Sequence, residues 1–156
     1  MIETAVRIRS AAPGDAQRIH ELHVAAVRAL CAPHYAPEIV EGWLANRSAH
    51  GYLRGINSGT VVVAELDSRV VGFGEGVPGK VVAVFVDPVF VNRGIGSALL
   101  EHTLRVAREE HRGPVRLKYT LNAVGFYERF GFYQVERSVV RRNHVEVPVV
   151  VMEHDG

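Results

Sequence analysis

Hydrophobic and polar positions along the chain follow two different periods. Apolar and basic residues alternate from Ala5 to Arg9, and this period of two predicts a half-buried strand. The next segment, 12–30, places its apolar residues broadly on one helical face behind Asp15, and therefore predicts a helix. A second, shorter helix is expected over 38–45, followed by a loop rich in glycine and serine.

The middle of the chain predicts three strands and then a long helix. TVVVAEL and RVVGFGEG are β-branched runs separated by Asp67 and Ser68, which indicates a hairpin, and three glycines are expected to weaken the far end of the second run. KVVAVFV, over 80–86, is apolar enough for a buried strand. From Ile95 to Glu110 apolar and charged residues recur with the spacing of an amphipathic helix.

The C-terminal third predicts three more strands and one helix. VRLKYTL, over 115–121, is typical of a strand, and NAVGFYERF, over 122–130, of a short helix. Two strands that turn near Asn143 should follow, and Pro148 predicts that the second of them is an edge strand or carries a bulge. The order of strands and helices predicts an α/β or α+β fold with a mixed sheet.

Composition changes this picture only by exclusion. The 156 residues, 47% hydrophobic and 22% charged, predict a single folded domain over 1–156. A net charge of +1 gives no support for a nucleic-acid partner. Cys31 is the only cysteine, no apolar leader begins the chain, and the longest apolar run is too short for a membrane helix, so we expect a cytoplasmic protein without a membrane partner.

Two glycines stand immediately before the long amphipathic helix, in NRGIGSALL. Glycine costs a helix about 1 kcal/mol relative to alanine, so this placement needs a reason. Unpaired amides at a helix N-terminus form an anion site that glycines leave open to a phosphate, although a plain left-handed turn would need glycine as well. The spacing fits neither a Walker loop, because Ser97 and Ala98 follow Gly96, nor a dinucleotide turn, which needs a third glycine.

VFVDPVFVNRGIGSALLEHTLRVA, followed by NAVGFYERFGF, resembles the GNAT superfamily of acyl-CoA-dependent N-acetyltransferases. The family pattern is a strand, a V-x-P segment, an Arg or Gln with glycines three and five residues later, and a long helix. Val86, Pro88, Gly94 and Gly96 match it, whereas Val91 stands where the family has Arg or Gln. The resemblance implies a mostly antiparallel sheet of about seven strands flanked by about four helices. It also implies transfer of an acetyl group from acetyl-CoA, without a metal, to a primary amine that attacks the thioester directly.

The resemblance further implies which residues bind CoA. Backbone amides from 91 to 96 would hold the pyrophosphate, Asn122 would contact the CoA arm, and Arg93 would partly replace the side chain missing at Val91. The full set of expected CoA contacts is Phe85, Val86, Val91, Asn92, Arg93, Gly94, Ile95, Gly96, Ser97, Asn122 and Phe126.

For the chemistry, the resemblance implies that Tyr127 faces the thioester sulfur and protonates the departing thiolate. A core aromatic packed beneath the sheet is the alternative for this residue. A backbone N–H near Val86 should polarise the carbonyl. The VVAVFV run has no ionisable residue, so Glu75 is the candidate base, with a solvated carboxylate at the hairpin end as its alternative. His34 and Tyr35, between the first two helices, are candidate acceptor contacts.

The acceptor is expected to be a small-molecule or protein amine, and a homodimer stays open. Two other functions also stay open, namely an acyl-CoA-binding module without turnover and a phosphate-binding enzyme unrelated to CoA. His20 and His23 are three residues apart on the first helix, a spacing compatible with a metal. No further Cys or His motif accompanies them, so we expect solvated or core-edge histidines.

Overall fold

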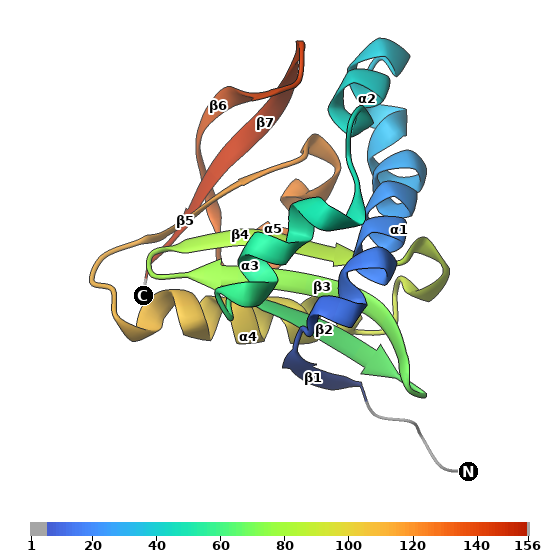
Figure 1. The fold of residues 1–156 in the computed structure, drawn as a ribbon. Helices are drawn as coiled ribbons and strands as arrows, with labels where there is room; N and C mark the ends of the chain where they lie inside the picture. Colours follow the sequence, from blue (N-terminus) through green and yellow to red (C-terminus); the bar gives the residue numbers. More distant parts are fainter. Residues whose placement is uncertain (1–5, 156) are drawn as a thin grey trace.

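Seven strands form one sheet in the computed structural model, which describes residues 6–155 (Figure 1). Most predicted elements are present; the first strand is described from Arg7, and Ala5, which the prediction included, lies outside the described residues. In chain order the elements are β1 (Arg7–Ser10), α1 (Ala16–Ala26), α2 (Pro37–Leu44), α3 (Leu53–Asn57), β2 (Val61–Leu66), β3 (Arg69–Val77), β4 (Lys80–Val86), α4 (Ile95–Glu109), β5 (Val115–Tyr119), α5 (Val124–Arg129), β6 (Tyr133–Arg142) and β7 (Val145–His154).

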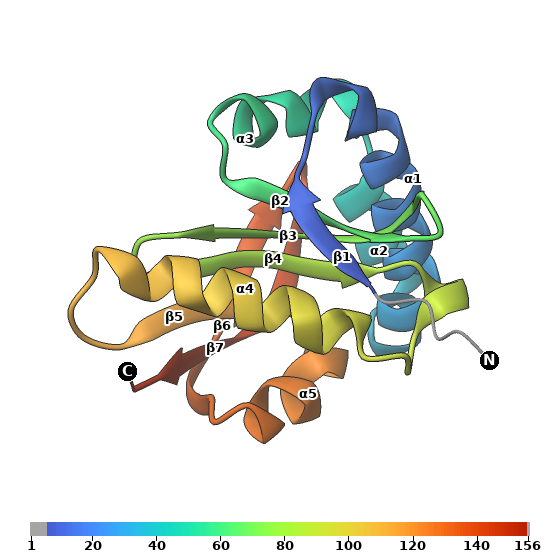
Figure 2. The same ribbon diagram turned by 90° about the horizontal axis from the view of Figure 1, so that it is seen from below.

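The sheet has the order β1-β2-β3-β4-β5-β7-β6, and every neighbouring pair is antiparallel except β4 and β5. Alternate residues of β2 face opposite sides, as a period of two requires: Val62 packs with α4, and Val63 packs with α1 and α3. Figure 2 shows α4 lying along one face of the sheet, while α1 and α3 lie on the other side. The predicted mixed, mostly antiparallel sheet of seven strands is confirmed.

The structure has one α-helix more than predicted. Helix α3 occupies part of the segment that the sequence predicts as a loop, and buries Ile56 among residues of α1 and β2. It has five residues, one of them glycine, so it is too short for a helical period to stand out from its surroundings.

The hairpin between β2 and β3 has the turn that its residues predict. Asp67 and Ser68 both have positive φ, at 52° and 62°, as in the two-residue turns that match strand twist. Strand β3 continues to Val77, and the expected weakening of its far end is limited to a register shift between Glu75 and Gly76 in the ladder with β4. A Cβ at Gly76 would lie 2.6 Å from the carbonyl oxygen of Thr103, so glycine there allows α4 to approach the sheet.

Pro148 lies in a strand that is an edge only locally. Strand β7 pairs with β6 along its length, but with β5 only from Val150 to His154. Pro148 is thus unpaired on its β5 side, where its carbonyl accepts a hydrogen bond from the Tyr35 hydroxyl at 2.6 Å. The alternative, a bulge in β7, is not found: the register shift in the β6–β7 ladder lies on β6, between Gln134 and Glu136, and Pro148 is in regular register with Val139.

Across residues 6–155, no helix combines the length and the apolar character that crossing a membrane would require.

Candidate active site

The two parallel strands in the middle of the sheet separate. A single residue pair, Lys80 with Arg116, joins β4 to β5, together with a hydrogen bond from the Arg116 amide to the Gly79 carbonyl. Beyond this point no residue pair is formed, and the Tyr119 hydroxyl spans the gap by donating to the carbonyl of Val84. The backbone of β4 is therefore open on its β5 side.

The direction of one amide on this open edge follows from strand alternation. The Asp87 amide donates to the carbonyl of Val71 on the β3 side, at 2.9 Å. Consecutive residues of a strand direct their N–H groups to opposite sides, so the Val86 amide points toward β5. A hydrogen-bond donor consequently faces the gap between the strands.

The turn between β4 and α4 is held by a buried carboxylate. Asp87 accepts a hydrogen bond from the Val89 amide at 3.0 Å and forms an ion pair with Arg18 at 2.5 Å. Burial acts to raise the pKa of Asp87, but the hydrogen bonds from Val89 and Arg18 and the charge of the arginines together lower it. Asp87 therefore stays ionised and fixes where the chain enters the turn.

The two glycines of this turn have different roles. Gly94, the N-cap of α4, has φ +79°, a left-handed conformation that glycine adopts without strain. No side chain caps the helix there, so its first amides lack a side-chain acceptor. Gly96 lies inside the helix, where an added Cβ would already touch the Phe126 ring at 3.4 Å. The helix thus presents bare backbone toward α5.

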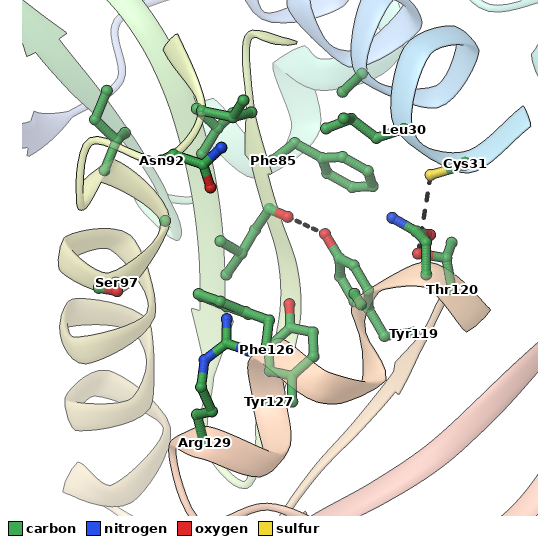
Figure 3. A pocket seen from close by; sticks show the side chains of 18 of the residues that line it. Leu30, Cys31, Phe85, Asn92, Ser97, Tyr119, Thr120, Phe126, Tyr127 and Arg129 are labelled. Atoms are coloured by element: carbon green, nitrogen blue, oxygen red, sulfur yellow. Dashed lines mark hydrogen bonds between the residues drawn. The ribbon is translucent and has the colours of Figure 1, made fainter. Parts of the chain in front are cut away.

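The gap between β4 and β5, the turn and α5 together form a cleft of about 600 Å³, which we call the β4–β5 cleft (Figure 3). It brings together ten of the eleven residues expected to contact CoA. Its lining is Ala26, Leu30, Cys31, Val84, Phe85, Val86, Phe90, Val91, Asn92, Gly94, Ile95, Gly96, Ser97, Tyr119, Thr120, Asn122, Ala123, Phe126, Tyr127, Arg129 and Phe130. Arg93 is the exception, because it is exposed and lies over the Phe90 ring, 5.4 Å from its centroid.

Tyr127 is both a core aromatic and a residue of the cleft wall. Its side chain is only 1% exposed, and it packs edge-on against Tyr119, with ring centroids 4.8 Å apart, and against Phe132. Its hydroxyl points into the β4–β5 cleft (Figure 3). Burial raises the pKa of Tyr127 well above that of an ordinary phenol, so this hydroxyl stays protonated.

Two cleft residues with reactive groups were not predicted from the sequence. Tyr119 ends β5 and donates to Val84, as described above. Cys31, 2% exposed, places its Sγ atom 3.9 Å from the Thr120 hydroxyl, and burial raises its pKa to about 11. The sequence gives only a weak signal for Tyr119 and Cys31, because their place in the cleft depends on which distant chain segments meet there. At neutral pH Cys31 is a thiol rather than the nucleophilic thiolate.

The remaining predicted residues lie elsewhere. Glu75 is on β3, where its carboxylate accepts a hydrogen bond from Thr60 and lies beside Gly55 of α3, and it does not line the β4–β5 cleft. His34 is likewise absent from the lining. Tyr35 is buried, and its hydroxyl donates to Pro148 and accepts from the Leu121 amide at 3.0 Å. Both hydrogen-bonding positions of Tyr35 are thus occupied by backbone.

The part of the chain that the structure describes holds no group of three or more His, Cys, Asp or Glu side chains arranged to bind a metal ion. His23 instead accepts or donates a hydrogen bond at 2.7 Å with the Tyr52 hydroxyl. His23 therefore has a local partner in Tyr52, whereas Nδ1 of His20 is buried without a hydrogen-bond partner.

Comparison with known proteins agrees with this geometry. The acetyltransferase (GNAT) domain family matches residues 31–153. The uncharacterized N-acetyltransferase YafP of Escherichia coli K12 is 28% identical over 135 residues, which are 86% of each chain.

Solved structures share the fold. A GCN5-related N-acetyltransferase from Rhodopseudomonas palustris superposes with a TM-score of 0.91 at 22% identity, covering 100% of this chain and 99% of that one. The PaiA N-acetyltransferase of Thermoplasma acidophilum, solved with coenzyme A, gives a TM-score of 0.75 at 20% identity, covering 97% and 99%.

Proposed function

The chain belongs to the acetyltransferase (GNAT) domain family, and on this premise we propose that it transfers the acetyl group of acetyl-CoA to a primary amine that attacks the thioester directly. The observation that carries the proposal is the β4–β5 cleft, which joins an open strand edge to an uncapped helix N-terminus. A helix N-terminus suits a phosphate, and an open strand edge suits an extended chain that contains amides. CoA has both.

One unsatisfied atom supports this ligand. Oδ1 of Asn122 is buried without a hydrogen-bond partner, and Asn122 lines the β4–β5 cleft. A buried acceptor of this kind costs free energy unless a ligand or water supplies a donor. We assign Asn122 to the CoA arm, and the amides around Gly94 and Gly96 to the pyrophosphate.

The thioester supplies an activated acyl group, and residues of this chain act on the two atoms where charge develops. The Val86 amide would polarise the carbonyl oxygen, and the Tyr127 hydroxyl would donate to the sulfur. Cys31 lines the same cleft, but its raised pKa keeps it as a thiol. Direct attack by the amine is therefore favoured over an acyl-cysteine intermediate.

The placement of Glu75 changes the proposal for the base. The titratable side chains that line the cleft are Cys31, Tyr119, Tyr127 and Arg129, and none of them takes a proton from an ammonium group at neutral pH. We therefore propose that the amine binds as its free base, having lost its proton to water.

We expect kcat/KM to rise about tenfold per pH unit up to the pKa of the acceptor amine, because the free-base fraction rises in that way. Glu75→Gln should leave the profile unchanged. Measuring kcat/KM from pH 6 to 10 for both proteins tests this. A break well below the amine pKa that disappears in Glu75→Gln would instead make Glu75 the base.

Val91→Gln should tighten CoA binding modestly, by a few-fold, because it adds a donor beside amides that are already in place. The measurement is the Kd of CoA by calorimetry, with Val89→Gln as control. Val89 is 73% exposed and does not line the cleft. Weaker binding by Val91→Gln alone would mean that position 91 does not face the phosphates.

Mixing acetyl-CoA with a panel of primary amines and measuring free thiol tests the proposed function itself. Release of CoA that depends on the amine supports acetyl transfer. Stabilisation by acetyl-CoA without release would indicate an acyl-CoA-binding module. Stabilisation by ATP but not by CoA would indicate a phosphate-binding enzyme of another kind.

A further inference from the structure

The tip of the β6–β7 hairpin is fastened to the C-terminal end of α2. Asn143, with φ +54°, forms the turn, and its side-chain amide donates to the carbonyls of Gly42 and Ala45, each at 2.8 Å. Arg142 precedes Asn143, and Arg47 follows Ala45 by two residues. Two segments about a hundred residues apart in the chain thus meet, and each carries an arginine next to the contact.

Strand alternation determines which side of the hairpin each arginine faces. Arg142 shares a face of β6 with Val140, and Val140 packs against the cluster that contains α2. Arg141 lies on the opposite face and pairs across the ladder with Glu146. Only Arg142 of these two is therefore directed toward α2 and Arg47.

Neither Arg47 nor Arg142 forms an ion pair with a carboxylate among residues 6–155. Arg47 donates through Nε to the carbonyl of Trp43 at 3.2 Å, and its guanidinium also lies beside the Tyr52 hydroxyl, so both of its neighbours are uncharged. Arg142 is exposed at the hairpin tip, and desolvation together with the charge of Arg47 lowers its pKa from the ordinary value. Like charges held close without a counter-ion are unfavourable, and a bound anion relieves that cost.

A layer of rings runs from Tyr52, which lies beside Arg47 and packs edge-on against His23, to the β4–β5 cleft. Phe85 lines the cleft, and the His23 ring packs on it with centroids 4.2 Å apart. Burial, with a further contribution from Arg47, lowers the pKa of His23 to about 3, so its ring is neutral. The positive charge on this side of Phe85 therefore comes from arginine rather than from histidine.

We propose that Arg47 and Arg142 form an anion subsite for the acceptor, so that the preferred amine also carries a carboxylate or a phosphate group. The inference rests on the proposed acetyl transfer. The phosphates of CoA are assigned to the N-terminus of α4, on the opposite face of the sheet from α1. The anion recognised beside α2 is thus part of the second substrate.

Matched amines test the preference. Wild-type protein should use β-alanine rather than its methyl ester, or phosphoethanolamine rather than ethanolamine, about 10- to 100-fold better in kcat/KM per free base, as expected for charge-assisted hydrogen bonds. The pair with the larger difference in kcat/KM shows whether the preferred anion is a carboxylate or a phosphate. Arg47→Gln and Arg142→Gln should each lose most of the preference, whereas Arg141→Gln, on the opposite face, should keep it. Equal use of charged and uncharged members by the wild type would overturn the proposal.

A second readout does not depend on turnover. With CoA saturating, so that its own phosphate site is filled, inorganic phosphate should raise the Tm of wild type and Arg141→Gln, but not of Arg142→Gln, relative to chloride at equal ionic strength. If no amine is acetylated while this difference holds, acetyl transfer fails and the anion subsite stands. If amines are acetylated but phosphate stabilises all three proteins equally, the subsite fails and acetyl transfer stands.

Discussion

Tyr127→Phe should lower kcat by roughly 10²-fold while it leaves CoA affinity and Tm nearly unchanged. The substitution keeps the ring, whose packing against Tyr119, Phe126 and Phe132 fixes its position. Only the hydroxyl that points into the β4–β5 cleft is lost (Figure 3). Steady-state rates, calorimetry with CoA and thermal melts measure the three quantities.

The acid–base properties of Tyr127 define its proposed role. Burial raises its pKa, so the hydroxyl is a hydrogen-bond donor at every working pH but a weaker acid than a free phenol. A thiol has an ordinary pKa of about 8.5, so complete proton transfer from the phenol to the thiolate is uphill. We therefore expect Tyr127 to stabilise the developing thiolate by donating a hydrogen bond.

Leaving-group dependence separates this role from a structural one. The loss in Tyr127→Phe should shrink with an acyl donor whose thiol is more acidic, because that thiolate needs less stabilisation. Tyr119→Phe is the matched control, since it removes the neighbouring cleft hydroxyl, which donates to Val84 and lies beside the Tyr127 hydroxyl. It should lower Tm without changing leaving-group dependence. A uniform loss with all donors, or a fall in Tm parallel to activity, would make Tyr127 a core aromatic.

The parts of the fold that sequence predicts well are those governed by neighbours in the chain. The turn at Asp67 and Ser68 and the amphipathic period of α4 are local signals, and both are confirmed. The strand environment of Pro148 was harder to predict, because whether a strand is an edge depends on where its partner strand ends. β5 stops at Tyr119, opposite Val150, which leaves Pro148 unpaired on that side.

The candidate site divides in the same way. The turn around Gly94 is contiguous in sequence, so its residues were predicted together, and nearly all of them line the cleft. Glu75 was chosen from its position at a strand end, but the face of β3 it occupies was not predictable, and that face carries it to Thr60 and α3. Arg47 and Arg142 gave no signal, because only the hairpin contact at Asn143 brings them together.

Gly94→Glu should abolish the stabilisation that CoA gives the wild-type protein. A ligand at a hundred times its Kd stabilises the folded state by about 2.7 kcal/mol, which corresponds to roughly 5–10 °C in Tm for a chain of this size. A Cβ at Gly94 meets no atom within 4 Å, so the substitution begins in open space. Its carboxylate, however, would stand at the amides assigned to the pyrophosphate and repel it.

Backbone strain must be separated from charge, because Gly94 has φ +79° and any other residue is strained there. Gly94→Ala carries the strain without the charge, so it should lower the Tm of the free protein as Gly94→Glu does, by a few degrees, yet keep most of the rise with CoA. Thermal melts with and without CoA measure both effects. Equal loss of CoA binding in the two variants would assign the effect to turn geometry. Full CoA binding by folded Gly94→Glu would mean that the N-terminus of α4 does not hold the pyrophosphate.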